Sequence, residues 1–473
     1  MTLPVASFLT DLDFIRVLYI VAFVLFIVGM RMLTKPSTAR QGNMVAAVGM
    51  AIAVVATLLI ESVGDYGLIA LGIAIGTIVG VPAARQVRMT AMPQMVALFN
   101  GVGGGAVALI AWGEYRHALG HGGNPELDTL IPILFAAIVG SISFWGSNIA
   151  FGKLQEIIPG KPITVPAQQV VNALLLLAAV AAAIAIVTGS ESQGLFILIL
   201  VAAAVLGNMV VLPIGGADMP VVISLLNALT GLSAAAAGIA LDNTALIVGG
   251  IIVGASGTIL TNLMAEAMNR SIPNIVAGGF GGGGTGGGGG GADTDGKTAK
   301  STDAADVAIQ LAYASRVVIA PGYGLAVAQA QHTVRELADE LEKRGVDVSY
   351  AIHPVAGRMP GHMNVLLAEA DVPYDALKEM DEINPEFAQT DVTLVIGAND
   401  VTNPAAREDE GSPIYGMPIL DVDKSGQVIV LKRSMNTGFA GIDNPLFYND
   451  NTSLLFGDAK ASVADVLTEV KNV

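Results

Sequence analysis

Nine apolar runs fill most of the first 270 residues of this 473-residue chain. A helix needs about 20 mainly apolar residues to cross the hydrocarbon core of a bilayer, and each run is close to that length. Because backbone polar groups in lipid must be satisfied within the protein, each run is predicted to be a transmembrane helix. The runs lie approximately at 12–32, 43–61, 67–82, 91–113, 128–152, 166–188, 194–212, 219–240 and 244–266.

The composition agrees with a membrane protein. Charged residues make up 14% of the chain, whereas soluble domains are about 25% charged. The first run is too long for a signal-peptide core and no small-residue cleavage site follows it, so we expect it to remain as a span. The net charge of −16 argues against nucleic acid as a partner. The absence of cysteine excludes disulfides and thiolate chemistry, and no metal site is predicted.

Basic residues gather in alternate loops and predict the orientation of the chain. Positive residues mark the cytoplasmic side of a membrane. The N-terminus is therefore expected outside and the C-terminal domain in the cytoplasm, with the spans in the cell inner (plasma) membrane, and an odd number of spans requires the same arrangement. The basic residues after the first, third, fifth and ninth spans are Arg31, Lys35 and Arg40, then Arg85 and Arg88, then Lys153 and Lys161, and finally Arg270.

Polar residues inside the spans are costly in lipid and therefore informative. For each asparagine, an interhelical hydrogen bond and a role in proton movement both remain open. Asp218 opens a span before Pro220, and it either caps that helix or takes part in proton movement. No histidine is expected within a span, since the five lie in an external loop (His117, His121) or in the soluble part. The polar candidates are Asn100, Asn172, Asn227, Ser256 and Asp218.

A glycine-rich segment separates the apolar part from the rest. It contains two glycine runs, at 281–284 and 286–291, and ends in polar residues. Such a segment behaves as a flexible coil. We therefore predict a transmembrane domain at 1–273, a linker at 274–302 and a soluble domain at 303–473. A passive tether and a hinge that lets the soluble domain reorient during turnover are both open.

The soluble part predicts a Rossmann-like α/β domain, because strands alternate with helices and this order is typical of a parallel sheet. Between the first strand and the first helix, residues 322–327 read G-x-G-x-x-V. Glycines in that context let the backbone approach a pyrophosphate. The strands are expected at 316–320, 346–352, 392–396, 417–420 and 427–431, and the helix at 329–343.

Two features favour NADP(H) over NAD(H). The second strand ends in His353-Pro354, where NAD-binding domains carry a carboxylate that would repel a 2′-phosphate. Lys432-Arg433-Ser434 directly follows an apolar strand and offers two cations and a hydroxyl to a dianionic phosphate. A solvated basic pair is the alternative for this segment. The loop at 397–400 also lies at a strand end, where open α/β sheets bind ligands.

The chain resembles the β subunit of proton-translocating NAD(P) transhydrogenases over nearly its full length, most specifically in several uninterrupted segments. That resemblance implies a subunit that holds NADP+ and receives hydride from NADH on a partner subunit. Inward proton movement would drive the formation of NADPH. The segments are 322–331, 353–362, 397–400, 432–438 and 457–460, and in the apolar part 214–227 and 267–271.

The resemblance also implies roles for individual residues. NADP(H) would lie reversed relative to the usual Rossmann pose, with its 2′-phosphate on 432–434 and the loop 457–460 folded over it. Asp400 would lie near the nicotinamide and link its redox state to protonation. The implied cofactor contacts are Gly322, Tyr323, Gly324, Val327, Ala328, His353, Val355, Ala356, Gly357, Arg358, Met359, Gly397, Asn399, Asp400, Lys432, Arg433, Ser434, Met435, Gly457, Asp458, Ala459 and Lys460.

In the membrane, the resemblance ties Asn227, Asp218 and Arg270 to proton movement or its coupling. Asn100 stands where some family members have a histidine of the proton path. An amide does not take up a proton at physiological pH, so we expect the titrating histidine to come from a membrane helix of the partner.

The implied partner is an α subunit that carries the NAD(H)-binding domain and further membrane helices, with αβ units paired as a dimer in the lipid bilayer. A channel or transporter with a regulatory dinucleotide-sensing domain is the alternative. Such a sensor would need neither the basic segment 432–434 nor Asp400 beside the ring.

Overall fold

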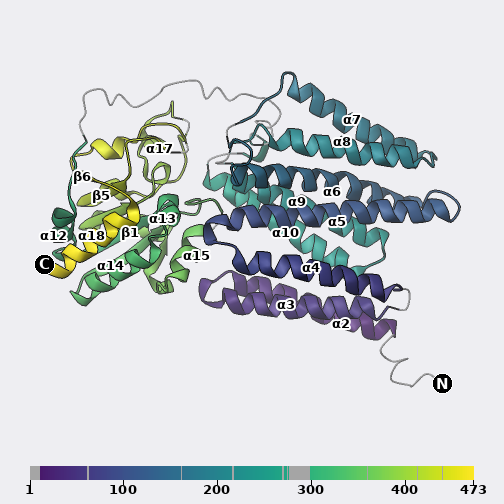
Figure 1. The fold of residues 1–473 in the computed structure, drawn as a ribbon, viewed down its shortest axis with the longest axis horizontal. Coiled ribbons are helices and arrows are strands. Elements are labelled where there is room, and N and C mark those ends of the chain that lie inside the picture. Colours follow the sequence, from purple (N-terminus) through teal and green to yellow (C-terminus); the bar gives the residue numbers. More distant parts are fainter. Residues whose placement is uncertain are drawn as a thin grey trace. The chain divides into compact units, whose positions relative to one another are not determined.

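The protein is described by a computed structural model over residues 11–60, 63–160, 162–215, 218–268, 271–273, 275, 299–359, 361–412, 414–438 and 440–473 (Figure 1). Over these ranges nine helices are long and apolar enough to cross a membrane, which confirms the predicted number of spans. They are α2 (Leu12–Leu33), α3 (Pro36–Leu58), α4 (Tyr66–Gln86), α5 (Met92–Gly120), α6 (Leu127–Leu154), α7 (Gln168–Val187), α8 (Gln193–Val211), α9 (Met219–Ala240) and α10 (Thr244–Ala267).

Two of these helices extend well beyond their apolar runs. Helix α3 begins at Pro36 rather than at 43, because proline fits the first helical turn, where its missing N–H is not needed. Helix α5 continues to Gly120, so His117, which was expected in a loop, lies in its last turn. A hydropathy pattern detects only the part of a helix that lies in lipid, so it does not predict the polar turns at either end.

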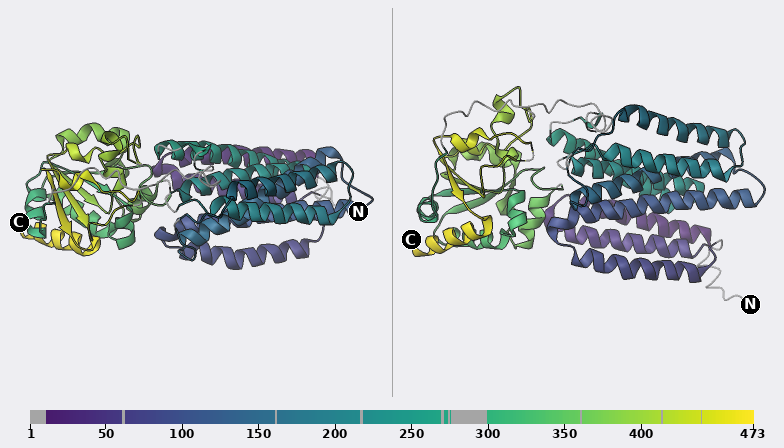
Figure 2. Two further views of the ribbon diagram at one scale, coloured as in Figure 1. Left: turned by 90° about the horizontal axis from the view of Figure 1, so that it is seen from above. Right: turned by 45° about the horizontal axis from the view of Figure 1, so that its top comes forward.

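The long helices run side by side (Figures 1 and 2), and glycines allow the closest contacts between them. A Cβ placed on Gly104 of α5 would lie 2.9 Å from the carbonyl oxygen of Gly140 in α6. A Cβ on Gly140 would lie 2.8 Å from the carbonyl oxygen of Gly104. Small residues permit such backbone contact in lipid, where packing rather than hydrophobicity holds helices together.

Replacing Gly104 by leucine is therefore expected to force α5 and α6 apart. Overpacking costs about 1–3 kcal/mol and more where backbone is the obstacle, so the purified variant should show a lower melting temperature in detergent and a lower folded yield. Gly113→Leu in the same helix is the matched control, because nothing lies within 4 Å of a Cβ at Gly113. Equal effects of the two substitutions would contradict this account of the α5–α6 contact.

The C-terminal part contains a six-stranded sheet in the order β3-β2-β1-β4-β5-β6, and every neighbouring pair is parallel. The predicted Rossmann-like class is confirmed. Along β1 and β4 nearly every residue is buried, as expected for strands covered on both faces. The strands are β1 (Arg316–Pro321), β2 (Asp347–Ile352), β3 (Leu377–Glu379), β4 (Val392–Ile396), β5 (Gln427–Lys432) and β6 (Thr452–Phe456).

One face of the sheet is covered by α12 (Ala304–Ala312), α14 (Gln331–Lys343), α15 (His362–Glu369) and α18 (Ala459–Asn472). The other face is covered by short elements, among them α16 (Met380–Ile383), η3 (Asn384–Gln389) and η6 (Pro445–Tyr448). Figure 1 shows α14 and α18 side by side over the strands. The remaining elements are η1 (Met89–Ala91), α13 (Tyr323–Ala328), η2 (Tyr374–Ala376), η4 (Asp400–Thr402), α17 (Ala405–Glu408) and η5 (Val422–Lys424).

Some expectations for this domain were wrong. The apolar segment 417–420 is not a strand, because Pro418 has no N–H for a ladder and Leu420 N donates to Val401 O at 2.9 Å instead. The helix expected at 329–343 is present as α14, and it begins two residues later, at Gln331, because Gln329 adopts a left-handed conformation (φ 51°) that ends the short helix α13. Strands β3 and β6 had no counterpart in the sequence-based assignment.

The chain joins the sheet just before α12. Thr302 N donates to Leu454 O at 3.0 Å, and Leu454 N donates to Lys300 O at 2.7 Å, so residues 300–302 lie along β6. Most of the glycine-rich segment assigned to the linker, 276–298, lies outside the described residues.

Candidate functional site

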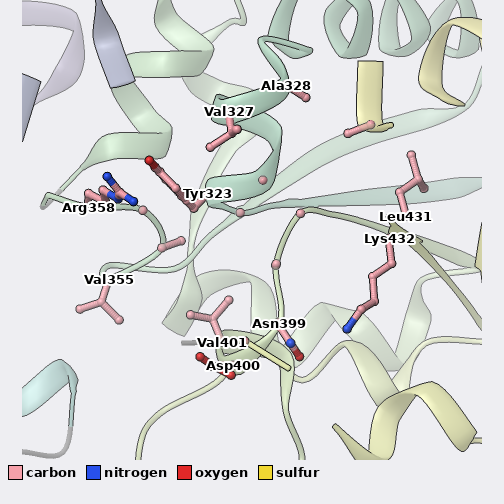
Figure 3. A pocket seen from close by; sticks show the side chains of 18 of the residues that line it. Tyr323, Val327, Ala328, Val355, Arg358, Asn399, Asp400, Val401, Leu431 and Lys432 are labelled. Atoms are coloured by element: carbon pink, nitrogen blue, oxygen red, sulfur yellow. The ribbon is translucent and has the colours of Figure 1, made fainter. Parts of the chain in front are cut away.

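A pocket lies over the carboxyl ends of the strands, at the point between β1 and β4 where the strand order reverses (Figure 3). Open α/β sheets bind their ligands at this switch point. Of the residues implied for the cofactor, only His353, Met435 and Lys460 do not line the pocket. Those that line it are Gly322, Tyr323, Gly324, Val327, Ala328, Val355, Ala356, Gly357, Arg358, Met359, Gly397, Asn399, Asp400, Lys432, Arg433, Ser434, Gly457, Asp458 and Ala459.

Three glycines form the floor of the pocket, where the turns after β1 and β4 touch backbone to backbone. Gly324 N donates to Gly397 O at 3.0 Å, and Gly322 N donates to Ile396 O at 2.9 Å. Gly397 has a φ of 68°, and a Cβ there would lie 2.5 Å from Gly324 Cα. There is no room for a side chain where these two turns meet. A pyrophosphate needs close access to the main chain, and three glycines leave the main chain uncovered here.

One end of the pocket carries Arg358, from the loop after β2. Its guanidinium lies 4.5 Å from the centre of the Tyr323 ring, so the two side chains stack as a cation on an aromatic face. Gly357, just before it, has a φ of 113°, which turns the loop sharply. Figure 3 shows Arg358 beside Tyr323, with Asn399 between this pair and Lys432.

The other end carries Lys432, the last residue of β5. Its Nζ donates to Asn436 O at 3.0 Å and lies 4.0 Å from the centre of the Phe447 ring. Burial lowers the pKa of Lys432, and Asp443 and Asp400 partly offset that effect. Arg433 and Ser434 follow in the exposed segment directly after the strand. A half-buried ammonium beside an exposed guanidinium and a hydroxyl is well suited to a phosphate.

Asp400 is held by the segment that follows the basic residues. Ala440 N donates to Asp400 Oδ2 at 2.9 Å, and a Cβ on Gly438 would lie 2.5 Å from Asp400 Oδ1. Fully buried Asn444 donates from Nδ2 to the main-chain oxygen and to Oδ1 of Asn399, both at 3.1 Å. Gly438, Ala440 and Asn444 are functional candidates that the sequence pattern does not single out. The signal for Asn444 was its place before Pro445, typical of a helix cap.

Comparison with known proteins agrees with this geometry. A family model described as NAD(P) transhydrogenase beta subunit matches residues 15–469. The chain belongs to this family. Two curated proteins from Rhodospirillum rubrum, one of them from a named strain, are each called NAD(P) transhydrogenase subunit beta. Each is 51% identical over 453 residues, which cover 95% of this chain and 97% of the relative.

In an NAD(P) transhydrogenase β subunit, a role can be assigned to each of the two parts of the fold. The nine apolar helices indicate a multi-pass membrane protein, and the α/β domain is the part suited to bind NADP(H). The name of the subunit implies an α-subunit partner.

In this transhydrogenase subunit, His353 supports the pocket from behind. Its Nε2–H donates to Pro418 O at 2.8 Å, and its Nδ1 accepts from Val355 N at 3.2 Å. Both ring nitrogens are thus engaged within the protein, so the ring fixes the loop 353–359 rather than lining the pocket. Burial lowers the pKa of His353 to about 4, partly offset by the bond to Pro418.

The domain is therefore expected to lose stability in acid through His353. Since its pKa falls from 6.5 to about 4 on folding, the stability is complete above pH 6.5 and is lost as the pH falls to about 4, by roughly 3 kcal/mol. Urea unfolding at several pH values should show a shallower loss for His353→Gln, which cannot titrate. His332→Gln, at an exposed histidine, should follow the wild type. A wild-type slope in His353→Gln would contradict the assignment.

The membrane candidates come from several helices and differ in their contacts. Asn100 of α5 is buried, and its Nδ2 donates to Ser147 Oγ of α6 at 2.9 Å. From α6, Ser143 Oγ donates to Leu226 O of α9 at 3.0 Å. Asn227 is half-buried in α9, and Asp218 lies directly before α9 with Pro220 in its first turn, the place of a helix cap. Arg270 lies outside the described residues.

The other two polar candidates differ from each other. Asn172 is fully buried in α7, and among the described residues neither its Nδ2 nor its Oδ1 has a hydrogen-bond partner. Ser256 of α10 is exposed, and its Oγ donates to Val253 O at 3.3 Å within the same helix. The hydroxyl of Ser256 therefore has its hydrogen-bond partner within its own helix.

Proposed function

We propose that this chain is the NADP(H)-binding, proton-translocating subunit of a transhydrogenase. Hydride would pass from NADH, held by the partner α subunit, to NADP+ held here, and inward proton movement would drive it. The observation that carries this proposal is a glycine-floored pocket at the switch point with a cationic side chain at each end.

The residues present fit the cofactor. The backbone around Gly322, Gly324 and Gly397 would hold the diphosphate, with Arg358 beside it. The segment 432–434 would hold the 2′-phosphate, which NAD lacks, and this difference would select NADP(H). When bound, the cofactor supplies the hydride chemistry, while the protein binds and orients it.

Asp400 would link protonation to the cofactor. As a carboxylate it accepts the N–H of Ala440, and Gly438 packs directly against it. Protonation of Asp400 would weaken this charge-assisted bond and loosen the segment beside the pocket. The pocket would then differ between the two protonation states, as the coupling of redox state to proton movement requires.

The proton path would use the polar chain from Asn100 through Ser143 to α9, with Ser147 as a second partner of Asn100. Since an amide does not titrate near neutral pH, a histidine from an α-subunit helix would supply the titrating group. Asn227, Asp218 and Arg270 would connect this path to the soluble domain.

The proposed transhydrogenase activity also implies how the complex is assembled. One dinucleotide pocket cannot hold both cofactors, so the α subunit would bring NAD(H) and further membrane helices, and αβ units would pair as a dimer. The N-terminus would lie outside and the soluble domain in the cytoplasm, in the inner membrane. A regulatory sensor on a channel would need neither the basic segment 432–434 nor Asp400 beside the ring.

The test is a coupled assay in sealed vesicles that contain this chain and its α subunit. Hydride transfer between NADH and an NADP+ analogue should move protons, and an imposed proton gradient should accelerate the formation of the reduced NADP analogue. An uncoupler should abolish that acceleration, and Asp400→Asn should reduce coupled turnover by roughly 100-fold. Hydride transfer that is indifferent to the gradient would refute the coupling, and no transfer at all would refute the activity.

A further inference from the structure

A buried histidine lies behind the pocket at the start of α15 and has no part in the function proposed above. His362 is only 1% exposed. Its Nδ1 accepts the N–H of Arg358 at 3.0 Å. Its ring packs edge-to-face with the ring of Tyr323, with ring centres 6.0 Å apart and planes at 72°. The imidazole thus contacts both members of the pair that forms one end of the pocket.

The hydrogen bond to Arg358 fixes the protonation of the ring. Nδ1 can accept an N–H only when it carries no proton, so the neutral ring must hold its proton on Nε2. Burial, and then the positive charge of Arg358, lower the pKa of His362, which favours this neutral form. Among the described residues, Nε2 has no hydrogen-bond partner.

The loop before His362 packs closely against the His362 side chain. Gly357 has a φ of 113°, and a Cβ there would lie 2.6 Å from His362 Cβ. Because the loop has no room to slide over the ring, the amide of Arg358 can meet Nδ1 only in this conformation. That conformation sends the Arg358 side chain to the face of Tyr323, with 4.5 Å from the guanidinium carbon to the ring centre.

We infer that His362 is a positioning residue for Arg358, and that through Arg358 it sets the affinity of the pocket for the diphosphate of a dinucleotide. This inference rests on the proposed NADP(H) site. His362 touches no pocket surface itself. Its hydrogen bond to the main-chain N–H of Arg358 holds Arg358 in the one conformation that keeps the guanidinium at the pocket wall.

The test compares two substitutions in the full chain purified in detergent, with NADPH as the probe. Asparagine places Oδ1 where histidine has Nδ1, so His362→Asn should bind NADPH within about threefold of the wild type. Leucine fills the space but cannot accept the N–H, so His362→Leu should bind about tenfold more weakly. The control His332→Leu, at an exposed histidine of α14, should bind like the wild type. Wild-type affinity for His362→Leu, or an equal loss for His362→Asn, would overturn the inference.

A double-mutant cycle separates positioning from general packing. If His362 acts through Arg358, then His362→Leu should weaken NADPH binding less than about twofold in an Arg358→Ala background. Additive losses would overturn the inference. If the wild type binds no NADPH, the proposed function itself fails, and this result is distinct from either outcome of the cycle.

A spectroscopic measurement needs no substitution that could impair folding. In protein labelled with ¹⁵N-histidine, the ring nitrogens of His362 should report a protonated Nε2 and an unprotonated Nδ1 at neutral pH. A proton on Nδ1 would exclude the bond to Arg358 and overturn the inference.

Discussion

Replacing Lys432 by alanine is expected to weaken NADP(H) binding roughly 10- to 100-fold and to change NAD(H) binding little. A hydrogen bond to a charged group contributes about 1.5–3 kcal/mol, and only NADP(H) carries a phosphate that could receive it at this end of the pocket. Lys432 is half-buried between Phe447 and the main chain of Asn436, so its ammonium is already partly stripped of water. A phosphate that meets it therefore displaces less solvent than at an exposed lysine.

Arg433→Ala should act in the same direction, and more weakly, because Arg433 is exposed. Lys424→Ala is the matched control, since Lys424 pairs with Asp421 away from the pocket, at 2.6 Å. Calorimetric titration of each variant with NADPH and NADH measures both affinities. Equal losses for the two cofactors would contradict the assignment of 432–434 to the 2′-phosphate.

Replacing Gly397 by alanine is expected to abolish cofactor binding and to lower the free energy of unfolding by more than about 3 kcal/mol. Two costs combine at this position. A left-handed conformation costs a non-glycine residue about 1–2 kcal/mol, and overpacking against backbone costs about 1–3 kcal/mol more. The added Cβ would lie 2.5 Å from Gly324 Cα, so relief would require the two turns that floor the pocket to separate.

Gly345 provides the control that isolates the second cost. It too is left-handed, with a φ of 87°, but nothing lies within 4 Å of a Cβ placed there. Gly345→Ala should therefore lose about 1 kcal/mol and bind NADPH normally. Urea unfolding and NADPH titration of both variants measure the difference. If the two variants lost equal stability and both bound NADPH, the backbone contact at the pocket floor would not be needed for binding, and the prediction would be contradicted.

The sequence predicted the apolar helices well, because about 20 apolar residues in a row have few alternatives to a span. It missed the polar turns at their ends, such as the last turn of α5 with His117. In the soluble domain, apolar runs located most of the sheet. Apolar composition alone was misleading at 417–420, because Pro418 has no N–H for a ladder and the main chain there bonds to Val401 and His353 instead.

The residues of the pocket wall were recoverable because they come in short continuous segments at strand ends. The residues that hold those segments were not. Asn444 reaches Asn399 across 45 positions. The His353 ring is oriented by hydrogen bonds to Pro418 and Val355, and the His362 ring by one to Arg358. Contacts of this kind follow from the assembled fold, and composition or spacing does not encode them.

The central claim is that the α/β domain selects NADP(H), and calorimetry on residues 299–473 tests it most directly. Both hydrophobic cores of the sheet are built from residues within this range, so the fragment is expected to fold by itself. We predict tight binding of NADPH and NADP+ and at least 100-fold weaker binding of NADH and NAD+. A preference for NAD(H), or no binding by a folded fragment, would contradict the account and favour a dinucleotide sensor or a domain without a cofactor.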